Sequence, residues 1–476
     1  MADVTPPWPG TGDTPPWPGT DDTAPGASGD DWAITDEEVV RFTSDLIRID
    51  TTNRGGGDCR ERPAAEYVAE RLADAGLAPR ILESAPGRAN VVARVPGSDP
   101  AAPGLLVHGH LDVVPADPAN WRVPPFSGEV RDGMVWGRGA LDMKNADAMV
   151  LALVRAWART GRRPKRDIVL AFTADEEDSA AYGAEWLVRE HPGEFEGCTE
   201  GISESGGYTH HARTVSGRPV RLYPVGAGER GSAWLRLTAH GTAGHGSRRN
   251  PDNAVGALAG AVARIHEHRW PIRLTPVTRA AITEIGAAVG VKVDLDSPGF
   301  VAERDLDALL ERLDPTSRLV AGTVRNSANP TMLDAGYKVN VIPESASAGI
   351  DGRVLPGAAR EFEETLDELT GPAVEWAYQH RSDPLVSPVE SPTFAAMRSA
   401  LLAHDPGAHV VPVCLSGGTD AKQFAALGIT GYGFTPLRLP ADLDHGTLFH
   451  GVDERVPVDA LRFGVRVLDR FLTSVD

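Results

Sequence analysis

The sequence predicts an α/β fold built on a mainly parallel mixed sheet with helices on both faces. Short apolar segments of strand character alternate along the chain with longer segments whose apolar residues recur at helical spacing. Three of the strand-like segments end directly before histidine or acidic residues. Ligands of such sheets bind outside the carboxyl ends of the strands, so we expect the functional site at that edge.

The first helix is expected to begin at Thr35, because Thr35-Asp-Glu-Glu38 is a capping-box pattern and apolar residues follow at helical spacing. The second expected helix, 63–75, should stop at Gly76, a residue type favoured just after a helix. The other expected elements are, in order, strands 90–95 and 105–107, a buried helix 146–157, strand 167–173, strand 234–238, helix 253–265 and strand 348–353.

Length and composition limit the class of protein. A chain of 476 residues is too long for one compact core, so two domains are expected. It contains no apolar run of about 18 residues, so no membrane span is expected. The start lacks a basic segment followed by an apolar core, which argues against a signal peptide and favours a cytoplasmic location. The net charge of −19 argues against nucleic acid as a partner, because phosphates repel such a surface.

Two further features of the sequence, its cysteines and its N-terminal segment, are not expected to form a disulfide framework or a folded domain. The three cysteines are too few and too scattered for a disulfide framework, and they lack metal-site spacing. Residues 1–30 form a leader rich in Pro, Gly and Asp in which Thr5-Pro-Pro-Trp-Pro-Gly-Thr recurs from Thr14. Such a composition predicts disorder. Its tryptophans, Trp8 and Trp17, are either docking points or part of an acidic solubilising tail.

The stretch from Leu105 to Pro115 carries the first candidate site residues. An apolar strand delivers His110 and Asp112, two residues apart and therefore on one side. An imidazole can bind a metal while a nearby carboxylate holds its other ring nitrogen. The same His-x-Asp pattern is also typical of a hydrogen-bonded pair in a loop.

Two acidic positions follow the next elements. Asp142 lies in a Gly-rich loop before a helix, where a helix N-cap is the alternative. A single carboxylate there can also give one oxygen to each of two metal ions about 3.5 to 4 Å apart. Glu176 and Glu177 follow a strong strand and point in different directions, so one can bind a metal while the other faces the activated water. Solvated surface charge is the alternative for this acidic run.

The remaining candidates are Glu204 and a histidine near the C-terminus. Glu204 follows a short apolar segment and precedes glycines that allow close backbone approach. His445 and His450 both lie in turn-like sequence, and periodicity does not choose between them. Two histidines and three carboxylates would suit zinc, with cobalt or manganese as substitutes.

Taken together, the motifs resemble those of one family: the two-zinc metallopeptidases that include aminoacylase, acetylornithine deacetylase, succinyl-diaminopimelate desuccinylase, carnosinase-like dipeptidases and bacterial glutamate carboxypeptidase. The resemblance runs in order from about residue 36 to the end. The motifs that carry it are His110-Leu-Asp112, Gly137-Arg-Gly-Ala-Leu-Asp-Met-Lys144, Asp175-Glu-Glu177, Ala243-Gly-His-Gly-Ser247, Asn340-Val-Ile-Pro343, Asp351-Gly-Arg353, Ser416-Gly-Gly-Thr-Asp420 and His450-Gly-Val-Asp-Glu454.

The resemblance implies a role for each position. His110 and Glu204 would hold one zinc, Glu177 and His450 the other, and Asp142 would bridge them. Asp112 would orient His110, and Glu176 would be the general base. Relatives often place Gly directly after the carboxylate that matches Glu204, whereas Ser205 stands here. His108 is interpreted as a packing residue, because the motif needs one histidine.

The resemblance also divides the chain into a leader (1–30), a zinc-peptidase-like catalytic domain (31–224 and 378–476) and a smaller inserted α+β lid domain (225–377). Substrate would bind His245, Asn340, Arg353, Gly418 and Thr419. The planar fork of Arg353 suits a carboxylate, although an ordinary surface arginine beside Asp351 is the alternative, as is a plain Gly turn for Ser416–Thr419. In dimeric relatives the histidine matching His245 comes from the partner subunit, which would make this chain a homodimer.

The function predicted from these residues is hydrolysis of an amide bond in a small substrate with a free carboxylate. A dipeptidase or carboxypeptidase is the first hypothesis and an N-acyl-amino-acid amidohydrolase the second, because both need the same catalytic residues. A non-catalytic binding protein on the same scaffold is the third. It would lack the base or a ligand, and all of these residues are present.

Overall fold

The computed structural model describes residues 29–475, and these form two compact units. The first unit contains the residues up to Gly226, Pro388–Val411 and the residues from Thr419 on, and the second contains Ala227–Ser387 and Pro412–Gly418. The predicted boundary at 377 falls inside strand β15 (Val374–Ser382), which pairs with β10 (Gly231–His240) along most of its length. The second unit therefore continues to Ser387.

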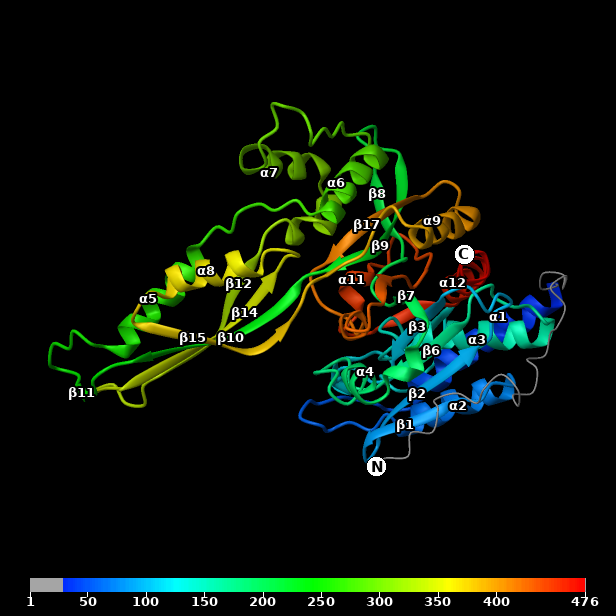
Figure 1. Cartoon of the computed structure of the whole chain (residues 1–476), viewed down its shortest axis with the longest axis horizontal. Coiled ribbons are helices and arrows are strands. Elements are labelled where there is room, and N and C mark those ends of the chain that lie inside the picture. The colour runs from blue at the N-terminus through cyan, green and yellow to red at the C-terminus, as the bar shows by residue number, and fades with distance from the viewer. Residues whose placement is uncertain (1–28, 476) are drawn as a thin grey trace. The chain divides into compact units, whose positions relative to one another are not determined.

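The first unit is organised by a mixed sheet (Figure 1). Its strands lie in the order β1 (Arg80–Ala85), β2 (Arg88–Val95), β6 (Ile168–Thr173), β3 (Gly104–His110), β7 (Cys198–Ser203), β18 (Thr430–Gly433) and β9 (Pro219–Glu229), with β8 (His210–Arg213) and β17 (His409–Leu415) paired to β9. The four central strands β6, β3, β7 and β18 are parallel. The predicted α/β class with a mixed, centrally parallel sheet is thereby confirmed.

Every residue of β3 and of β6 is buried, because helices cover both faces of the sheet. On one face, Leu106 and Val169 pack with Leu187 of α4 (Ala184–Glu190) and Phe424 of α10 (Ala421–Ala425). The long helix α3 (Lys144–Thr160) contacts β3, and it also contacts the helices α1 (Gly29–Arg48) and α12 (Val458–Ser474). The other helices of this unit are α1 (Gly29–Arg48), α2 (Arg62–Asp74), α9 (Pro392–His404), α11 (His445–Leu448) and α12 (Val458–Ser474), and a small sheet joins β4 (Val130–Arg131), β5 (Met134–Trp136) and β19 (Arg455–Pro457).

The predicted start of the first helix is wrong. Helix α1 begins at Gly29, and Thr35 is buried inside it, where its hydroxyl donates to the carbonyl of Asp31 at 2.8 Å. Asp30 and Asp31 occupy the first turn, where carboxylates favour the helix dipole. The last two residues of the predicted leader are therefore helical. The rest of that prediction, including Trp8 and Trp17, lies outside the described residues.

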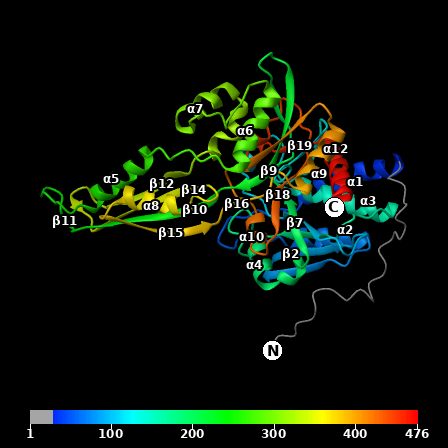
Figure 2. The same ribbon diagram turned by 45° about the horizontal axis from the view of Figure 1, so that its top comes forward.

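The second unit contains a four-stranded antiparallel sheet in the order β12 (Ser327–Ala335), β14 (Ser345–Val354), β10 and β15. Figures 1 and 2 show α5 (Ala254–Glu267) and α8 (Ala359–Thr370) on the same face of this sheet. Alternate residues of β10, among them Leu235 and Leu237, form a core with these helices. Its remaining elements are β11 (Gly244–His245), α6 (Pro276–Val289), α7 (Ala302–Leu313), β13 (Val341–Ile342) and β16 (Leu385–Val386).

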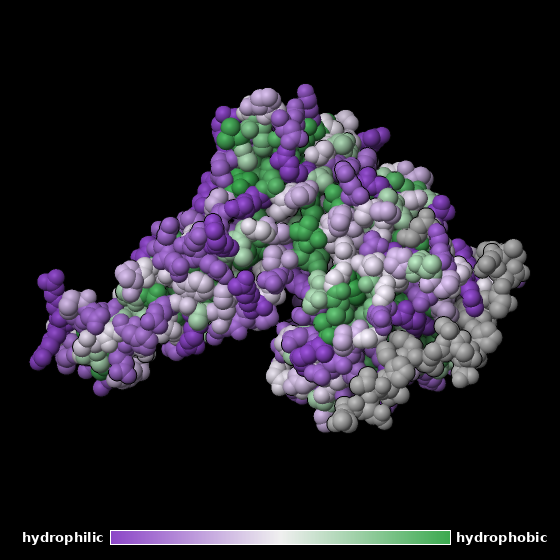
Figure 3. Space-filling model, in the orientation of Figure 1, coloured by the Kyte–Doolittle hydropathy of each residue, from purple (hydrophilic) through white to green (hydrophobic). Residues whose placement is uncertain are grey.

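The face of the molecule drawn in Figure 3 is mostly hydrophilic, with apolar patches between the charged side chains. Among the described residues, no helix has the length and apolar character needed to cross a membrane. All three cysteines are buried, and none of them is in a disulfide.

Candidate metal centre

Five predicted ligand residues of the first unit converge where strands β3, β6 and β7 end. His110 is the last residue of β3, Asp142 precedes α3, Glu177 follows β6, and Glu204 follows β7. His450 comes from the loop after α11. The parallel strands bring the first, third and fourth of these together because their carboxyl ends share one edge of the sheet.

Asp142 lies between the two histidines. Its Oδ1 is 3.1 Å from Nε2 of His110, and its Oδ2 is 3.1 Å from Nε2 of His450. The same nitrogen of His450 is 3.0 Å from Glu177, and Nε2 of His110 is 3.8 Å from Glu204. One carboxylate thus presents one oxygen to each histidine, as expected of a residue that bridges two metal ions.

Donor atoms here lie close enough to share a metal. Two groups each have all their ligand atoms within 4.8 Å of one another: His110 with Asp142 and Glu177, and His110 with Glu176 and Glu204. The buried Oε1 of Glu177 has no hydrogen-bond partner among the described residues. Histidine nitrogens and carboxylate oxygens are the donors that zinc binds, so the residues present fit a metal centre.

The electrostatics point the same way. Burial, with Asp142 close by, raises the pKa of Glu204 to about 8. Burial and the neighbouring Glu204 raise the pKa of Glu176, and burial and Asp142 raise that of Glu177. Hydrogen bonds to Asp142 and Glu177 raise the pKa of His450 to about 10. The excess of buried negative charge therefore favours cations, which the protonated imidazoles supply when no metal is bound.

The orientation of His110 differs in one detail from the predicted one. Its Nδ1 is 3.0 Å from the backbone carbonyl of Asp112 and 3.6 Å from the carboxylate of that residue. The Nδ1–H therefore donates to the carbonyl, and Nε2 faces the other carboxylates. The Asp112 carboxylate instead accepts the backbone N–H groups of Glu176 and Glu177, each at 3.2 Å, and the side-chain N–H of Asn53 at 2.9 Å.

Sequence reasoning missed the group that supports the Glu176–Glu177 turn. Asp175 has a φ of 66°, in the left-handed region that non-glycine residues rarely adopt. Its carboxylate accepts from Arg88 at 2.7 Å, from Asn53 at 3.0 Å and from Ser179 at 2.9 Å. Arg88 is buried and also forms an ion pair with Glu61 at 2.8 Å. These bonds hold the strained residue in place.

Sequence reasoning also missed a clamp around the Asp142 loop. The buried carboxylate of Glu454 accepts the backbone N–H groups of Leu141 at 2.6 Å and Asp142 at 3.2 Å, and it pairs with Arg138 at 2.6 Å. Arg138 in turn donates to the carbonyl of Gly451 at 3.0 Å. The loop that carries Asp142 is therefore fastened to the loop that carries His450.

The two C-terminal histidines have different surroundings. His450 joins the carboxylates, with a φ of 57°. His445 stacks on Tyr208, and burial lowers its pKa to about 4. His108, interpreted from the sequence as a packing residue, is buried with its ring 4.8 Å from that of Phe424. Burial lowers the pKa of His108 to about 3.

Four of the predicted substrate residues belong to the second unit: His245, Asn340, Arg353 and Gly418. The N–H of Gly246, next to His245, donates to the carbonyl of Asn340 at 2.9 Å. Arg353 forms a two-point ion pair with Asp351, at 2.8 and 3.2 Å, and donates to Ser232 at 3.1 Å.

Thr419, the fifth predicted substrate residue, belongs to the first unit. Its hydroxyl accepts the N–H of Ala421 at 3.2 Å, at the start of α10. Thr419 therefore has a local structural role in the described chain.

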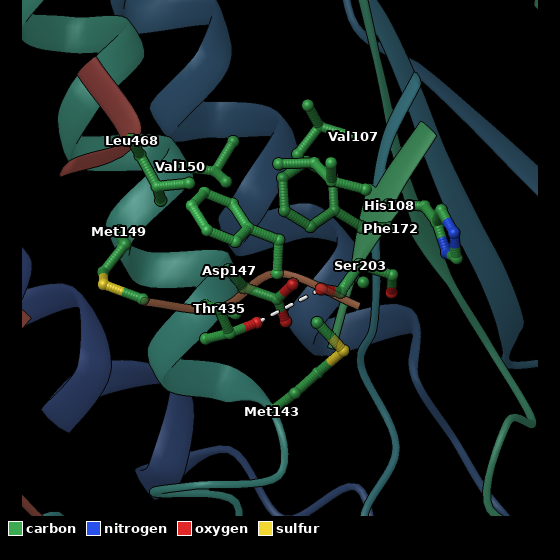
Figure 4. A pocket seen from close by; sticks show the side chains of 14 residues that line it. Val107, His108, Met143, Asp147, Met149, Val150, Phe172, Ser203, Thr435 and Leu468 are labelled. Atoms are coloured by element: carbon green, nitrogen blue, oxygen red, sulfur yellow. Dashed lines mark hydrogen bonds between the residues drawn. The ribbon is translucent and has the colours of Figure 1, made fainter. Parts of the chain in front are cut away.

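A cavity lies beside β3 (Figure 4), and none of the five proposed ligands is among its lining residues. Its lining is mainly apolar, with Val107, Phe172 and Leu468, and Asp147 of α3 is its one acidic residue. Asp147 is 2% exposed, and its Oδ2 has no hydrogen-bond partner among the described residues. Burial raises its pKa to about 8.

Comparison with known proteins identifies a family and several similar sequences. The model of peptidase family M20/M25/M40 matches residues 106–474. N-fatty-acyl-amino acid synthase/hydrolase PM20D1 of Xenopus tropicalis is 30% identical over 408 residues, which cover 80% of this chain and 74% of that protein. Aminoacylase-1 of Mus musculus is 27% identical over 421 residues, which cover 87% of this chain and 90% of that protein.

Solved structures share the fold. The M20 family metallo-carboxypeptidase Sso-CP2 from Sulfolobus solfataricus has a TM-score of 0.67 at 17% identity, covering 92% of this chain and 98% of that one. Human carnosine dipeptidase 1 has a TM-score of 0.62 at 16% identity, covering 93% of this chain and 96% of that one.

Proposed function

Because the chain belongs to peptidase family M20/M25/M40 and is a metal-dependent hydrolase, we propose that it cleaves an amide bond in a small substrate with a free carboxylate. The observation that carries the proposal is the position of Asp142, with its two oxygens 3.1 Å from the ring nitrogens of His110 and His450. Glu176 lies beside this arrangement, with its carboxylate 3.9 Å from His110.

The proposed centre holds two zinc ions, with cobalt or manganese as substitutes. His110 and Glu204 would hold one ion, Glu177 and His450 the other, and Asp142 would bridge them. Bound zinc would supply two kinds of chemistry: it would polarise the scissile carbonyl and lower the pKa of a bound water to about 7.

Glu176 is the proposed general base and acid. It would take a proton from the attacking water and return it to the nitrogen of the scissile bond. The C–N bond can then break with a neutral amine as the leaving group instead of a nitrogen anion. Its surroundings support this assignment, since burial and the neighbouring carboxylates raise its pKa above the ordinary glutamate value and make proton uptake easier. Asp112, which accepts the N–H of Glu176, would keep that carboxylate in position.

For the substrate, we propose an N-acyl amino acid first and a dipeptide second. The sequence motifs alone predict dipeptidase or carboxypeptidase activity as the first hypothesis. The relatives that are 27–30% identical favour the reverse order, because one is named an N-fatty-acyl-amino acid synthase/hydrolase and the other an aminoacylase. The likeness to dipeptidases and carboxypeptidases rests on structures about half as similar in sequence, which share the fold.

The second unit would bind the carboxylate of the substrate, through Arg353 and Asn340, and His245 would stabilise the oxyanion. Arg353 is already paired with Asp351, so a substrate carboxylate would share this guanidinium or displace that pair. Gly418 and Thr419 would complete the substrate contacts through backbone N–H groups and a hydroxyl.

We also propose a homodimer formed through the second unit. Strand β12 is an edge strand, and the large apolar side chains Met332, Leu333, Tyr337 and Val339 on and after it are exposed. Exposed apolar residues on an open edge favour pairing with another chain. Light scattering after gel filtration would measure the mass, and a monomer for the wild type would contradict the proposal.

A substrate panel tests the activity. Purified protein would be assayed with added zinc or cobalt on N-acyl amino acids and on dipeptides, with a chelator-treated sample as control. We expect metal-dependent release of the amino acid from at least one N-acyl substrate. Turnover of dipeptides alone would favour the second candidate, and no turnover by metal-loaded protein would favour the non-catalytic scaffold.

A further inference from the structure

An aromatic stack joins the two loops that carry Glu204 and His450. Tyr208 lies four residues after Glu204, and His445 lies five residues before His450. Their rings are parallel within 2°, with centroids 3.9 Å apart. Because one ring belongs to each loop, the stack lies at the side of the metal centre where the two loops meet.

The aromatic surface continues from this stack to the metal centre. The ring of Phe449 is 5.6 Å from that of His445 and 5.3 Å from that of His450. Phe449 is 40% exposed, and Val452, in the following turn, is 47% exposed. Large apolar side chains at this exposure next to a polar site mark a surface that a ligand can cover.

The loop that carries His445, Phe449 and His450 is fixed by contacts with the rest of the first unit. Asp444 caps α11 by accepting the N–H of Gly446 at 3.1 Å, and Leu448 is buried. The clamp formed by Glu454 and Arg138 fixes the backbone after His450. The aromatic surface is therefore presented by an anchored turn, and little has to be ordered when a ligand binds.

We infer that Tyr208, His445 and Phe449 form a subsite for the apolar acyl group of an N-acyl amino acid, beside the metal ligand His450. This inference rests on the proposed function. The rings of His445 and Phe449 lie next to the proposed metal ligand His450, beside which the acyl carbonyl would be polarised, so the chain attached to that carbonyl can contact them. An acyl chain on the rings would remove apolar surface of both from water.

The test compares acyl chains of different length on one amino acid. Zinc-loaded wild type, Phe449→Ala and Phe449→Leu would be assayed on N-acetyl, N-hexanoyl and N-dodecanoyl forms. Loss of the ring should lower the ratio of kcat/KM for dodecanoyl over acetyl substrate by about 10-fold, and Phe449→Leu should restore part of it. Ile34→Ala, which removes an exposed apolar side chain from α1, is the matched control and should leave the ratio unchanged.

Zinc content and melting temperature would be measured for each variant to separate a subsite effect from damage to the fold. An equal loss of kcat/KM on all three substrates, or no loss on any, would overturn the subsite. So would a change of oligomeric state in Phe449→Ala, because the surface would then be covered by a second copy of the chain.

Binding separates this inference from the proposed function. Calorimetry would compare N-dodecanoyl and N-acetyl amino acid binding to Glu176→Gln protein, with and without the additional Phe449→Ala change. If the wild type hydrolyses no N-acyl substrate, the proposed function fails, and tighter dodecanoyl binding that depends on Phe449 would still support the subsite. Equal affinities for the two ligands would overturn it.

Discussion

The backbone N–H of Glu176 donates to Oδ1 of Asp112 across 3.2 Å, and this bond ties the turn after β6 to the residues after β3. The other oxygen of the same carboxylate accepts the N–H of Glu177, also at 3.2 Å. Asp112 is fully buried, and although burial raises the pKa of its carboxyl, the neighbouring His110 and the hydrogen bonds from Asn53 and the Glu177 N–H hold that pKa below the ordinary value. One ionised side chain thus positions both the proposed base and a proposed metal ligand.

Asp112→Asn is expected to lower kcat by about 10- to 100-fold, the usual cost of losing a partner next to a metal ligand. The amide cannot accept both N–H groups, because one of its two side-chain atoms is a donor. Stopped assays with saturating zinc would measure kcat, and zinc titration would measure affinity. A fully active Asp112→Asn variant would remove Asp112 from this positioning role.

Glu176→Gln is expected to lower kcat by at least about 100-fold while two zinc ions remain bound, since proton transfer contributes about 10² to 10⁴ in rate. The neighbouring variant Glu177→Gln is the matched control. It should lose zinc as well as activity, because Glu177 is a proposed ligand. Loss of zinc in Glu176→Gln would show instead that Glu176 is a ligand, an arrangement consistent with the spacing of His110, Glu176 and Glu204.

Glu454→Gln should weaken zinc binding and destabilise the fold without touching a metal ligand. It leaves the buried Arg138 without its charge partner, and breaking a buried pair costs about 3 to 5 kcal/mol. We expect a lower midpoint in urea and a lower zinc content than in the wild type. Asp453→Asn changes the adjacent carboxylate, which pairs with the exposed Arg122, and should cost less than about 1 kcal/mol. Similar losses in the two variants would contradict the clamp.

The sequence was sufficient to predict those parts of the fold that depend on local pattern. Strands β3 and β6 are buried on both faces, so each contains an uninterrupted apolar run, Leu105–Val107 in β3 and Ile168–Phe172 in β6. The rule that parallel strands end at one edge predicts that His110, Glu177 and Glu204 lie together. The predicted start of α1 is wrong because two roles of threonine share one sequence pattern. A threonine can accept from the N–H groups of a first turn, or it can donate to the carbonyl four residues earlier, as Thr35 does.

The supporting contacts lie beyond the reach of local pattern. Arg138 and Glu454 are 316 residues apart in the chain and meet only after both loops have folded. Arg88 and Asp175 are 87 residues apart and join a strand to a turn. Each of these residues looks like an ordinary surface charge in the sequence. The choice between His445 and His450 likewise depended on which ring faces Asp142, a matter of loop conformation.

Asp147→Asn is expected to change how stability depends on pH. The pKa of Asp147 is raised from 3.8 to about 8 by burial, so the folded protein keeps a proton that the unfolded chain releases near pH 4. Stability contributed by this group is therefore fully present below about pH 4, falls as the pH rises towards 8, and is level above that. Asparagine has no such proton. The melting temperature of metal-free Asp147→Asn minus that of the wild type should accordingly grow between pH 5 and 8, while the exposed control Asp132→Asn should show a constant difference. A constant difference for Asp147→Asn would mean that the carboxyl is ionised in the folded protein.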